Sequence, residues 1–410
     1  MGKRAIVWLS VLWIVVVVAG VSSAITLRVS GGVLPAQEEA NGSVVVSQEE
    51  YQIMERYRRL DEVRGILEDE YYKPLDEDKL VLGAVRGMLA SVDDPYTFYY
   101  TPEEMQQMAE RSQGVYEGVG LLLSSDKDGM LVVLRIFEDS PAIEAGVKPG
   151  DIVLAVNGEL VGATDARQMD KAIQMIRDFQ GETLELTLKR GKKVQTISLK
   201  PRTITMQRVS HQVLPGDIGY IMIYEFIGDD ATGFIAAMND LKQKNVKGLI
   251  IDVRSNPGGL LTDVVKIADQ LLPAGLVVYT QDRSSAREEY FSDESRWDVP
   301  MAVLVNGMSA SASEILAGSL QDYGVAKIVG EKTYGKGIVQ TMLPFRTDNA
   351  GMQLTTATYF TPKGRSIHGV GIEPDVPVKA TVAVGGDPDL EKDAQLKAAY
   401  DLLTKRAARG

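Results

Sequence analysis

The stretch that decides the fold is MAVLVNGMSASASEILAGSLQDY, residues 301–323. Its apolar start, 301–305, predicts a buried strand, and its end, 312–323, predicts a helix. Ser311 therefore lies on a strand-to-helix corner, where the helix N-terminus favours negative charge and a nucleophilic hydroxyl can project. The plainer interpretation of Ser311 is a helix cap. The segment predicts an α/β domain with Ser311 as the candidate nucleophile.

A lysine between two glycines follows this corner. It is Lys336, in the sequence Gly335-Lys-Gly337. A lysine that serves as a general base must be neutral at working pH, so burial has to lower its pKa. A solvated lysine in a glycine-rich loop is the alternative. Gln340 comes four residues later on a predicted strand, and its amide could orient the lysine or contact substrate. Together these residues indicate a Ser–Lys nucleophile.

Strand and helix patterns alternate from residue 202 onward. The predicted strands cover 218–223, 248–253, 277–280, 302–305, 326–329, 338–342 and 354–358, and the predicted helices cover 231–244, 260–272 and 312–323. This order implies an α/β core with helices packed on a sheet. The tail, 387–408, is predicted to form a surface helix.

A second glycine-rich turn closes the predicted strand near residue 251. The sequence IDVRSNPGG, 251–259, places Gly258 and Gly259 directly after a proline. Glycines leave backbone N–H groups unscreened, and such groups suit an oxyanion hole. The N–H of Ala312, next to the candidate nucleophile, could share it. An ordinary strand-to-helix turn is the other interpretation.

Residues 114–201 have a different character, with short predicted strands and several glycine turns. The segment begins with EGVGL, 117–121, and continues with DSPA, AG, KPGDIV and VNG. In this order and spacing the motifs resemble a PDZ domain. The resemblance implies that Gly118, Val119, Gly120 and Leu121 present backbone N–H groups to a peptide's terminal carboxylate, while a strand edge accepts the extended peptide.

The N-terminus predicts export. Lys3 and Arg4 precede an uncharged apolar stretch, 5–27, which as a helix would span roughly 34 Å, enough to cross a bilayer. The basic start places the N-terminus inside and the remainder outside. A cleavable signal peptide is the competing interpretation, because small residues occupy 22–24. We expect 1–27 to be an anchor or signal peptide, followed by a linker at 28–47.

Helical patterns fill residues 48–113. Ser47 and Glu50 form a candidate capping box, and Pro102 begins the last of the predicted helices. No convergent catalytic pattern occurs here, so we expect a packing or dimerisation role.

Composition excludes several classes of function. The 410-residue chain has a net charge of −12, no cysteine and two histidines. An acidic balance argues against nucleic acid as a partner, and the lack of cysteine removes thiol catalysis, disulfides and thiolate metal sites. No phosphate-binding loop occurs, and two histidines make a poor zinc site, so no metal or cofactor is expected. A triad of Ser311 with His368 and either Asp375 or Asp252 is conceivable, but a structural or surface role for the histidine is preferred.

Four motifs occur in order and together resemble the C-terminal processing (tail-specific) serine peptidases. They are DVRSNPGG at 252–259, NGMSASASE at 306–314, GEKTYGKGIVQ at 330–340, and YFTPKGRSI at 359–367 with GIEPD at 371–375. The resemblance covers about 48–380. It implies that Ser311 is the nucleophile, Lys336 the general base and Gln340 its assistant, with the oxyanion hole formed by Gly258 or Gly259 and Ala312. It also implies a crotonase-like core, and a PDZ domain that binds protein tails and gates the active site.

The sequence thus predicts a multidomain α/β protein: a helical region (48–113), an inserted PDZ domain (114–201), a protease core (202–380) and a tail with a helix (381–410). The predicted function is that of an exported serine endopeptidase that binds protein C-termini and cleaves near them through an acyl-enzyme. A homodimer and an envelope adaptor protein stay open as partners, besides the membrane. Two rival functions also stay open: a catalytically silent PDZ scaffold or chaperone, and a crotonase-like enzyme acting on thioesters, which export disfavours.

Overall fold

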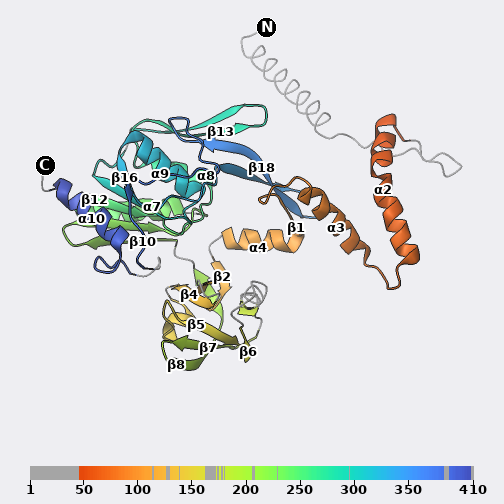
Figure 1. Ribbon diagram of the computed structural model, residues 1–410, viewed down its shortest axis with the longest axis horizontal. Coiled ribbons are helices and arrows are strands. Elements are labelled where there is room, and N and C mark those ends of the chain that lie inside the picture. Colours follow the sequence, from red (N-terminus) through yellow and green to blue (C-terminus); the bar gives the residue numbers. More distant parts are fainter. Residues whose placement is uncertain are drawn as a thin grey trace, which may run out of the picture. The chain divides into compact units, whose positions relative to one another are not determined.

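The computed structural model describes residues 46–112, 115–125, 130–137, 139–161, 172, 175, 176, 179, 181–205, 208–228, 230–294, 296–382 and 387–407. The predicted anchor or signal peptide and most of the linker lie outside these residues. The chain divides into two compact units, Met1–Gly87 and Met88–Gly410, which are described separately (Figure 1). None of the described helices is both long and apolar enough to cross a membrane.

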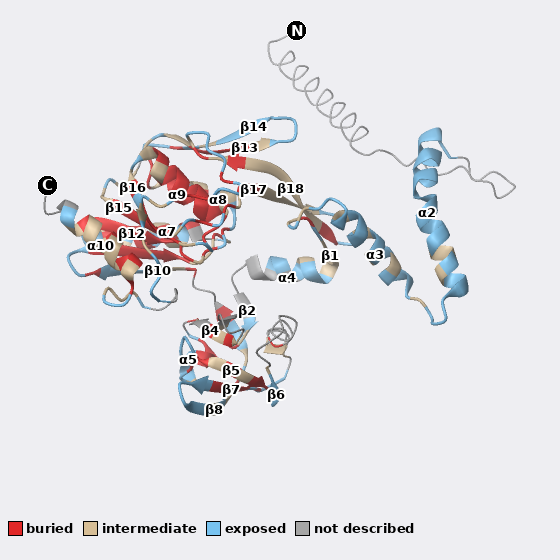
Figure 2. Ribbon diagram, viewed as in Figure 1, coloured by how far each residue is buried: buried red, intermediate tan, exposed pale blue. Residues whose placement is uncertain are grey.

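The described part of the first unit, residues 46–87, is helical, as predicted. Helix α2, Gln48–Glu70, begins at a capping box in which Glu50 N–H donates to Ser47 Oγ at 3.2 Å and Ser47 N–H donates to Glu50 Oε2 at 2.7 Å. Helix α3 covers Glu77–Ala90 and continues into the second unit. Both helices lack buried residues, and Figure 2 draws them largely as exposed. Their apolar side chains therefore have no core of their own.

A six-stranded sheet forms the centre of the second unit, in the order β10-β11-β12-β15-β16-β19. Its strands are β10 Val209–Leu214, β11 Ile218–Ile223, β12 Gly248–Asp252, β15 Met301–Val305, β16 Ala326–Gly330 and β19 Val376–Pro377. Only the β10–β11 pair is antiparallel. Strands β12 and β15 are parallel neighbours, so their carboxyl ends lie at the same edge of the sheet. The glycine turn follows β12 and the Ser311 turn follows β15.

Helices cover both faces of this sheet, as its fully buried central strands β11, β12 and β15 require. Along β11, Ile221 and Ile223 pack with helices α7 Asp230–Gln243, α8 Leu261–Asp269 and α9 Ala312–Tyr323, whereas Tyr220 and Met222 pack with helix α10 Ala394–Ala407. The alternation follows from the two-residue period of a strand. The prediction of a surface helix in the tail is therefore wrong. Its residues Leu396, Ala399 and Leu403 are at most 2% exposed, and α10 closes the second face.

A second sheet in this unit has the order β1-β18-β13-β14, with β17 also paired to β18. Its strands are β1 Phe98–Tyr100, β13 Gly275–Asp282, β14 Arg287–Ser292, β17 Ile338–Pro344 and β18 Gly351–Phe360. Strand β1 precedes helix α4, Pro102–Ser112. Its pairing with β18 brings a segment from before the PDZ region against the core, which the sequence did not predict.

The predicted half-barrel of short strands is confirmed. Its sheet has the order β3-β4-β5-β7-β8, with β6 paired to β5. The elements are β3 Leu121–Ser125, β4 Leu131–Ile136, α5 Pro141–Glu144, β5 Ile152–Val156, β6 Glu159–Leu160, β7 Leu184–Arg190 and β8 Lys193–Leu199. A separate pair, β2 Val115–Gly118 and β9 Arg202–Thr205, joins its two ends. Leu184, Leu186 and Leu188 fill its own small core.

Candidate active site

Ser311 lies at the N-terminus of α9 in a strained conformation. Its φ is 54° and its ψ is −115°, in a region that residues with a side chain rarely adopt. Such a conformation persists only where the surroundings enforce it, and it is typical of functional turns. Here it presents a half-buried serine at the positive end of a buried helix.

The two flanking serines hold the corner in place. Ser309 Oγ donates to Val253 O at 2.8 Å, and Ser313 Oγ donates to Asn256 O at 3.0 Å. Both side chains are fully buried. They therefore tie the nucleophile turn to the loop that follows β12, whereas Ser311 itself occupies the N-cap position of α9.

Glu314 joins the turn of Ser311 to the loop of Lys336. Its carboxylate is fully buried and accepts the N–H of Ser311 at 3.0 Å and the N–H of Lys336 at 2.8 Å, both at Oε2. The other oxygen, Oε1, accepts from Gly335 N–H at 2.7 Å and from Thr333 Oγ1 at 2.5 Å. Four donors satisfy the carboxylate, so its burial is compensated.

Tyr359 on β18 joins the same two segments from the other side. Its ring is 1% exposed, and its hydroxyl lies 3.1 Å from Ser311 O and also contacts Lys336 O. Burial, followed by the nearby charge of Glu314, raises the pKa of Tyr359 well above its ordinary value. The hydroxyl therefore stays protonated and able to donate.

Lys336 is half-buried, and desolvation lowers the pKa of its amine below 10.5, although the charge of Asp94 acts in the opposite direction. Its Nζ lies 4.6 Å from the centroid of the Tyr96 ring. Among the described residues, no hydrogen bond directly joins Nζ to Ser311 Oγ. The two residues predicted as nucleophile and base are thus held together through their backbones, with the amine resting on Tyr96.

The glycine turn lies directly against the nucleophile. A Cβ on Gly258 would come within 2.7 Å of Ser311 Cβ and 2.9 Å of Ala312 N. Gly258 N–H donates to Asn256 Oδ1 at 2.8 Å, so this N–H is occupied. The N–H groups of Gly259 and Ala312 have no acceptor on the described part of the chain, which makes them the better pair of candidate oxyanion donors.

Gln340 lies on β17 at an irregularity in its pairing with β18. Its Nε2 lies 3.5 Å from Thr355 Oγ1, which is the limit of hydrogen bonding. The structure thus places Gln340 beside Thr355 and gives it no direct bond to Lys336 within the described residues.

A buried network of ion pairs connects the start of the glycine turn to the C-terminal helix α10. Arg254 follows β12, and its Nη2 lies 2.6 Å from Asp252 Oδ2 and 2.8 Å from Asp393 Oδ2. Tyr220 Oη donates to Asp252 Oδ2 at 2.7 Å. Because Arg254 is 3% exposed, losing either carboxylate would leave a buried charge unpaired.

Neither histidine supports a triad. His368 is exposed, and its two candidate orienters have other partners: Asp252 pairs with Arg254, and Asp375 accepts from Ile328 N–H at 2.8 Å. His211 lies 2.9 Å from Asp240.

The predicted carboxylate loop of the PDZ region is a turn between β2 and β3. Val119 is 3% exposed, its carbonyl accepts from Ala142 N–H at 3.1 Å, and the carbonyl of Gly120 accepts from Phe137 N–H at 3.0 Å. The N–H groups of Val119 and Gly120 have no acceptor on the described residues. These free donors are what a terminal carboxylate needs.

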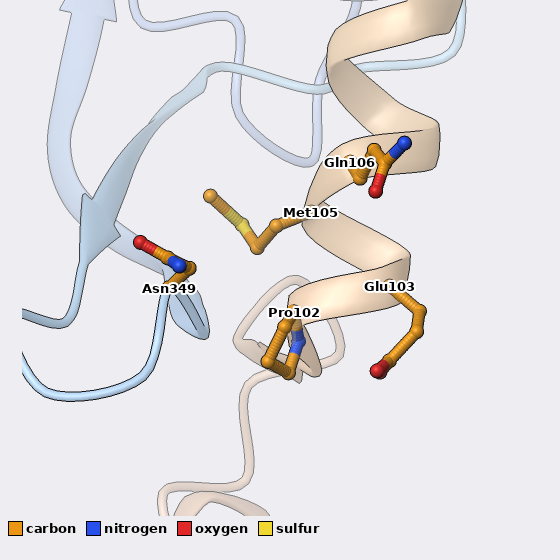
Figure 3. Close-up of a pocket in the computed structure, with 5 residues that line it drawn as sticks. All are labelled: Pro102, Glu103, Met105, Gln106 and Asn349. Carbon is orange, nitrogen blue, oxygen red and sulfur yellow. The ribbon is translucent and has the colours of Figure 1, made fainter.

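The pocket in Figure 3 lies elsewhere, between the start of α4 and the turn before β18. It is lined by Pro102, Glu103, Met105, Gln106 and Asn349. None of the candidate catalytic residues contributes to it.

Sequence reasoning missed three residues of the site: Glu314, Tyr359 and Tyr96. Only Glu314 had a local signal, since it lies three residues after Ser311 in a capping-box pattern. The other two reach the site from distant segments.

Comparison with protein families gives three matches. The model of peptidase family S41 matches residues 217–378, a PDZ domain model matches 118–200, and the N-terminal domain of the activating protease CtpB matches 24–104.

Individual proteins agree with these matches. The chain is 32% identical to the carboxy-terminal processing protease CtpA of Bacillus subtilis, over 90% of this chain and 77% of that protein. It is 34% identical to a probable CtpA-like serine protease of Staphylococcus epidermidis over 78% of this chain, and this match spans 65% of the relative's length. A solved photosystem II D1 C-terminal processing protease is similar in fold, with a TM-score of 0.53 and 28% identity, over 86% of this chain and 98% of that one.

The pairing of an S41 core with a PDZ domain, and the extent of the match to CtpA, confirm the predicted resemblance and the mixed α/β architecture. The chain belongs to peptidase family S41, in the group of C-terminal processing proteases that carry a PDZ domain.

Proposed function

We propose that this protein is an exported serine endopeptidase that binds protein C-termini and cleaves near them with Ser311 and Lys336. One observation carries the proposal: the buried Glu314 carboxylate receives the backbone N–H groups of both residues. This arrangement fixes a serine at a helix N-terminus beside a lysine whose pKa is lowered. A hydroxyl and a partly desolvated amine held together are what acyl transfer by a Ser–Lys pair requires.

In the first step, the neutral amine of Lys336 accepts the proton of Ser311 Oγ while Oγ forms a bond to the scissile carbonyl carbon. The negative charge that develops on the carbonyl oxygen is stabilised by the N–H groups of Gly259 and Ala312. Each such donor contributes about 3 kcal/mol to transition-state stabilisation in acyl transfer.

The tetrahedral intermediate then collapses. The C–N bond breaks, the protonated Lys336 gives its proton to the departing amine, and an ester remains on Ser311. Water attacks this ester with Lys336 again as the base, which releases the new carboxyl terminus and restores the hydroxyl. No cofactor takes part in these steps.

The arrangement of Lys336 corresponds to a resting state. Its Nζ lies on the Tyr96 ring, with no direct bond to Ser311 among the described residues. The attack therefore requires rotation of the lysine side chain toward Ser311. Gln340, on the adjacent strand β17, is placed to contact substrate or to steady the lysine after that rotation.

The PDZ domain supplies selection of the substrate. The N–H groups of Val119 and Gly120, which have no acceptor among the described residues, support binding of a terminal carboxylate in this loop. Strand β3, which begins at Leu121, offers an edge for the tail. Gly118 ends the preceding strand. We infer that a bound tail presents an upstream bond to Ser311.

The rival function, a catalytically silent PDZ scaffold, requires an ordinary lysine at position 336. The lowered pKa of Lys336 and the strained φ of Ser311 both favour the enzyme.

Location and assembly are further parts of the proposal. The apolar stretch 5–27 behind Lys3 and Arg4 supports export, with this segment as an anchor or as a cleaved signal peptide. The exposed apolar side chains of α2 support a homodimer through the helical region. We also propose that an envelope adaptor protein delivers substrates to the enzyme. The core is proposed to be related to the crotonase fold.

The test compares the full-length chain with Ser311→Ala and Lys336→Ala on an unfolded protein that has an apolar C-terminus. Thermal melting checks the folding of each variant, and mass spectrometry follows the cleavage. The proposal predicts cleavage by the wild type only. Equal cleavage by all three would contradict it, and binding without cleavage by any of them would favour the scaffold.

A further inference from the structure

The aromatic ring beneath Lys336 comes from a segment that precedes the PDZ region. Nζ lies 4.6 Å from the centroid of Tyr96, within the range of a cation–π interaction. An aromatic face attracts the charged ammonium through its quadrupole, and the neutral amine gains little from it. The contact therefore stabilises the form of the lysine that cannot act as a base.

The turn that carries Tyr96 is firmly held. Asp94 Oδ1 accepts from Tyr96 N–H at 3.0 Å, and Asp94 Oδ2 accepts from Thr97 Oγ1 at 2.6 Å. Strand β18 adds two bonds: Gln353 Nε2 donates to Tyr96 O at 3.0 Å, and Thr355 N–H donates to Thr97 Oγ1 at 3.4 Å. The backbone that carries the ring is thus held on both sides by hydrogen bonds of this turn and of β18.

Tyr96 is also connected to the nucleophile corner. The neighbouring side chain of Tyr334, together with burial, raises the pKa of Tyr96 to about 12. Tyr334 N–H donates to Ser309 O at 3.0 Å. The resting position of the lysine and the turn of Ser311 therefore share a support.

Other titratable groups surround Lys336, and they act in different directions. From the same turn, Asp94 favours the charged amine. From α9, Glu314 is engaged by four donors, two of them backbone N–H groups of the lysine loop. From β18, Tyr359 contacts the carbonyl of Lys336. The backbone of His368 lies against Gly337, since a Cβ there would come within 2.3 Å of His368 N.

We propose that Tyr96 is a positioning residue that holds Lys336 as a cation away from Ser311 in the resting enzyme, and releases it when substrate occupies the site. The inference rests on the proposed Ser–Lys mechanism. According to this inference, the Asp94–Thr97 turn, which directly precedes β1, helps to determine whether Lys336 is protonated.

The experiment measures kcat/KM against pH for the full-length chain, with an unfolded apolar-tailed protein as substrate. Tyr96→Leu removes the aromatic face, and Tyr96→Phe keeps the face and removes the hydroxyl. Phe98→Leu, on the same strand system and 47% exposed, is the matched control. Without the ring, Tyr96→Leu should move the acid limb to lower pH by about half a unit, the size that a cation–π contact implies. The other two variants should leave the limb in place.

An unmoved limb in a folded Tyr96→Leu variant, or the same shift in the Phe98→Leu control, would overturn the inference. If Tyr96→Leu does not fold, fluorinated phenylalanines at position 96 keep the size of the ring while weakening its quadrupole. The acid limb should then move to lower pH with each added fluorine. A limb that stays at the same pH throughout the series would overturn the inference. Ser311→Ala is measured in parallel. Cleavage by that variant would refute the proposed function itself, whereas its inactivity together with an unmoved limb would refute only the role of Tyr96.

Discussion

A single carboxylate oxygen, Glu314 Oε2, accepts the backbone N–H of Ser311 at 3.0 Å and that of Lys336 at 2.8 Å. Glu314 thereby fixes the separation of the proposed nucleophile and base without touching their functional groups. The bond to Ser311 also stabilises the φ of 54° at that residue. We conclude that the buried carboxylate of Glu314 organises the site, and that the catalytic side chains project from the backbone segments that it holds.

Replacing this anion should damage activity more than its small change in volume suggests. Glu314→Gln keeps the shape but supplies one oxygen for four donors. The variant should lose roughly 1–3 kcal/mol of stability for each buried donor left unpaired and about 100-fold in kcat, because misplacing a catalytic group by about 1 Å has this effect. Thermal melting and steady-state cleavage measure the two losses. Glu391→Gln, at an exposed position, is the control and should match the wild type.

The glycine turn gives a second prediction. A Cβ at Gly258, where φ is 105°, would lie 2.7 Å from Ser311 Cβ and 2.8 Å from Ala310 O. Gly258→Ala should therefore displace the nucleophile turn and reduce kcat at least 100-fold. In Gly307→Ala, the new Cβ would lie 3.8 Å from Lys332 O, an ordinary van der Waals contact, so this variant should keep its activity. Equal activity of the two variants would show that the turn does not support catalysis.

The hydroxyl of Tyr359 should matter for both stability and rate. Tyr359→Phe preserves the buried ring and removes the group that contacts Ser311 O and Lys336 O. The expected loss is about 1–2 kcal/mol in the free energy of unfolding, and about tenfold in kcat if the two backbones separate slightly. Denaturant unfolding measures the first. Unchanged values of both quantities would mean that this hydroxyl has no bridging role.

Activity should depend on the deprotonation of Lys336. A base must be neutral, so activity falls as pH drops through its pKa. Desolvation lowers this pKa, and the acid limb of kcat/KM should accordingly lie below pH 10.5. Lys336→Arg keeps a permanent charge and should be inactive at every pH, since arginine does not lose its proton. Lys332→Arg, whose partner is the exposed Glu373, should behave as the wild type. An active Lys336→Arg enzyme would rule out the lysine as base.

Local patterns in the sequence predicted much of this site. Ser311 and Ala312 lie at the predicted strand-to-helix corner, and Gly258 packs against them from the predicted turn. These features follow from short-range rules on strands, caps and glycines. The local pattern made Lys336 a candidate base but left a solvated lysine as the alternative, and the family resemblance then favoured the base.

The rest depended on long-range pairing that periodicity does not encode. Tyr96 reaches Lys336 only because β1 pairs with β18, and Tyr359 reaches Ser311 from β18 itself. The tail helix looked like a surface helix, yet α10 covers one face of the central sheet and Asp393 at its start binds the buried Arg254. A marginal apolar stripe in a charged helix does not reveal which surface covers it.

The most direct test of the Ser–Lys account is labelling of the protein with a serine-directed phosphonofluoridate, followed by peptide mass spectrometry and measurement of the rate. The account predicts one adduct on Ser311. Its rate of formation should rise with pH along the same limb as cleavage, and should fall at least 100-fold in Lys336→Ala. Labelling at another serine, or labelling of Ser311 at an undiminished rate without Lys336, would contradict the account.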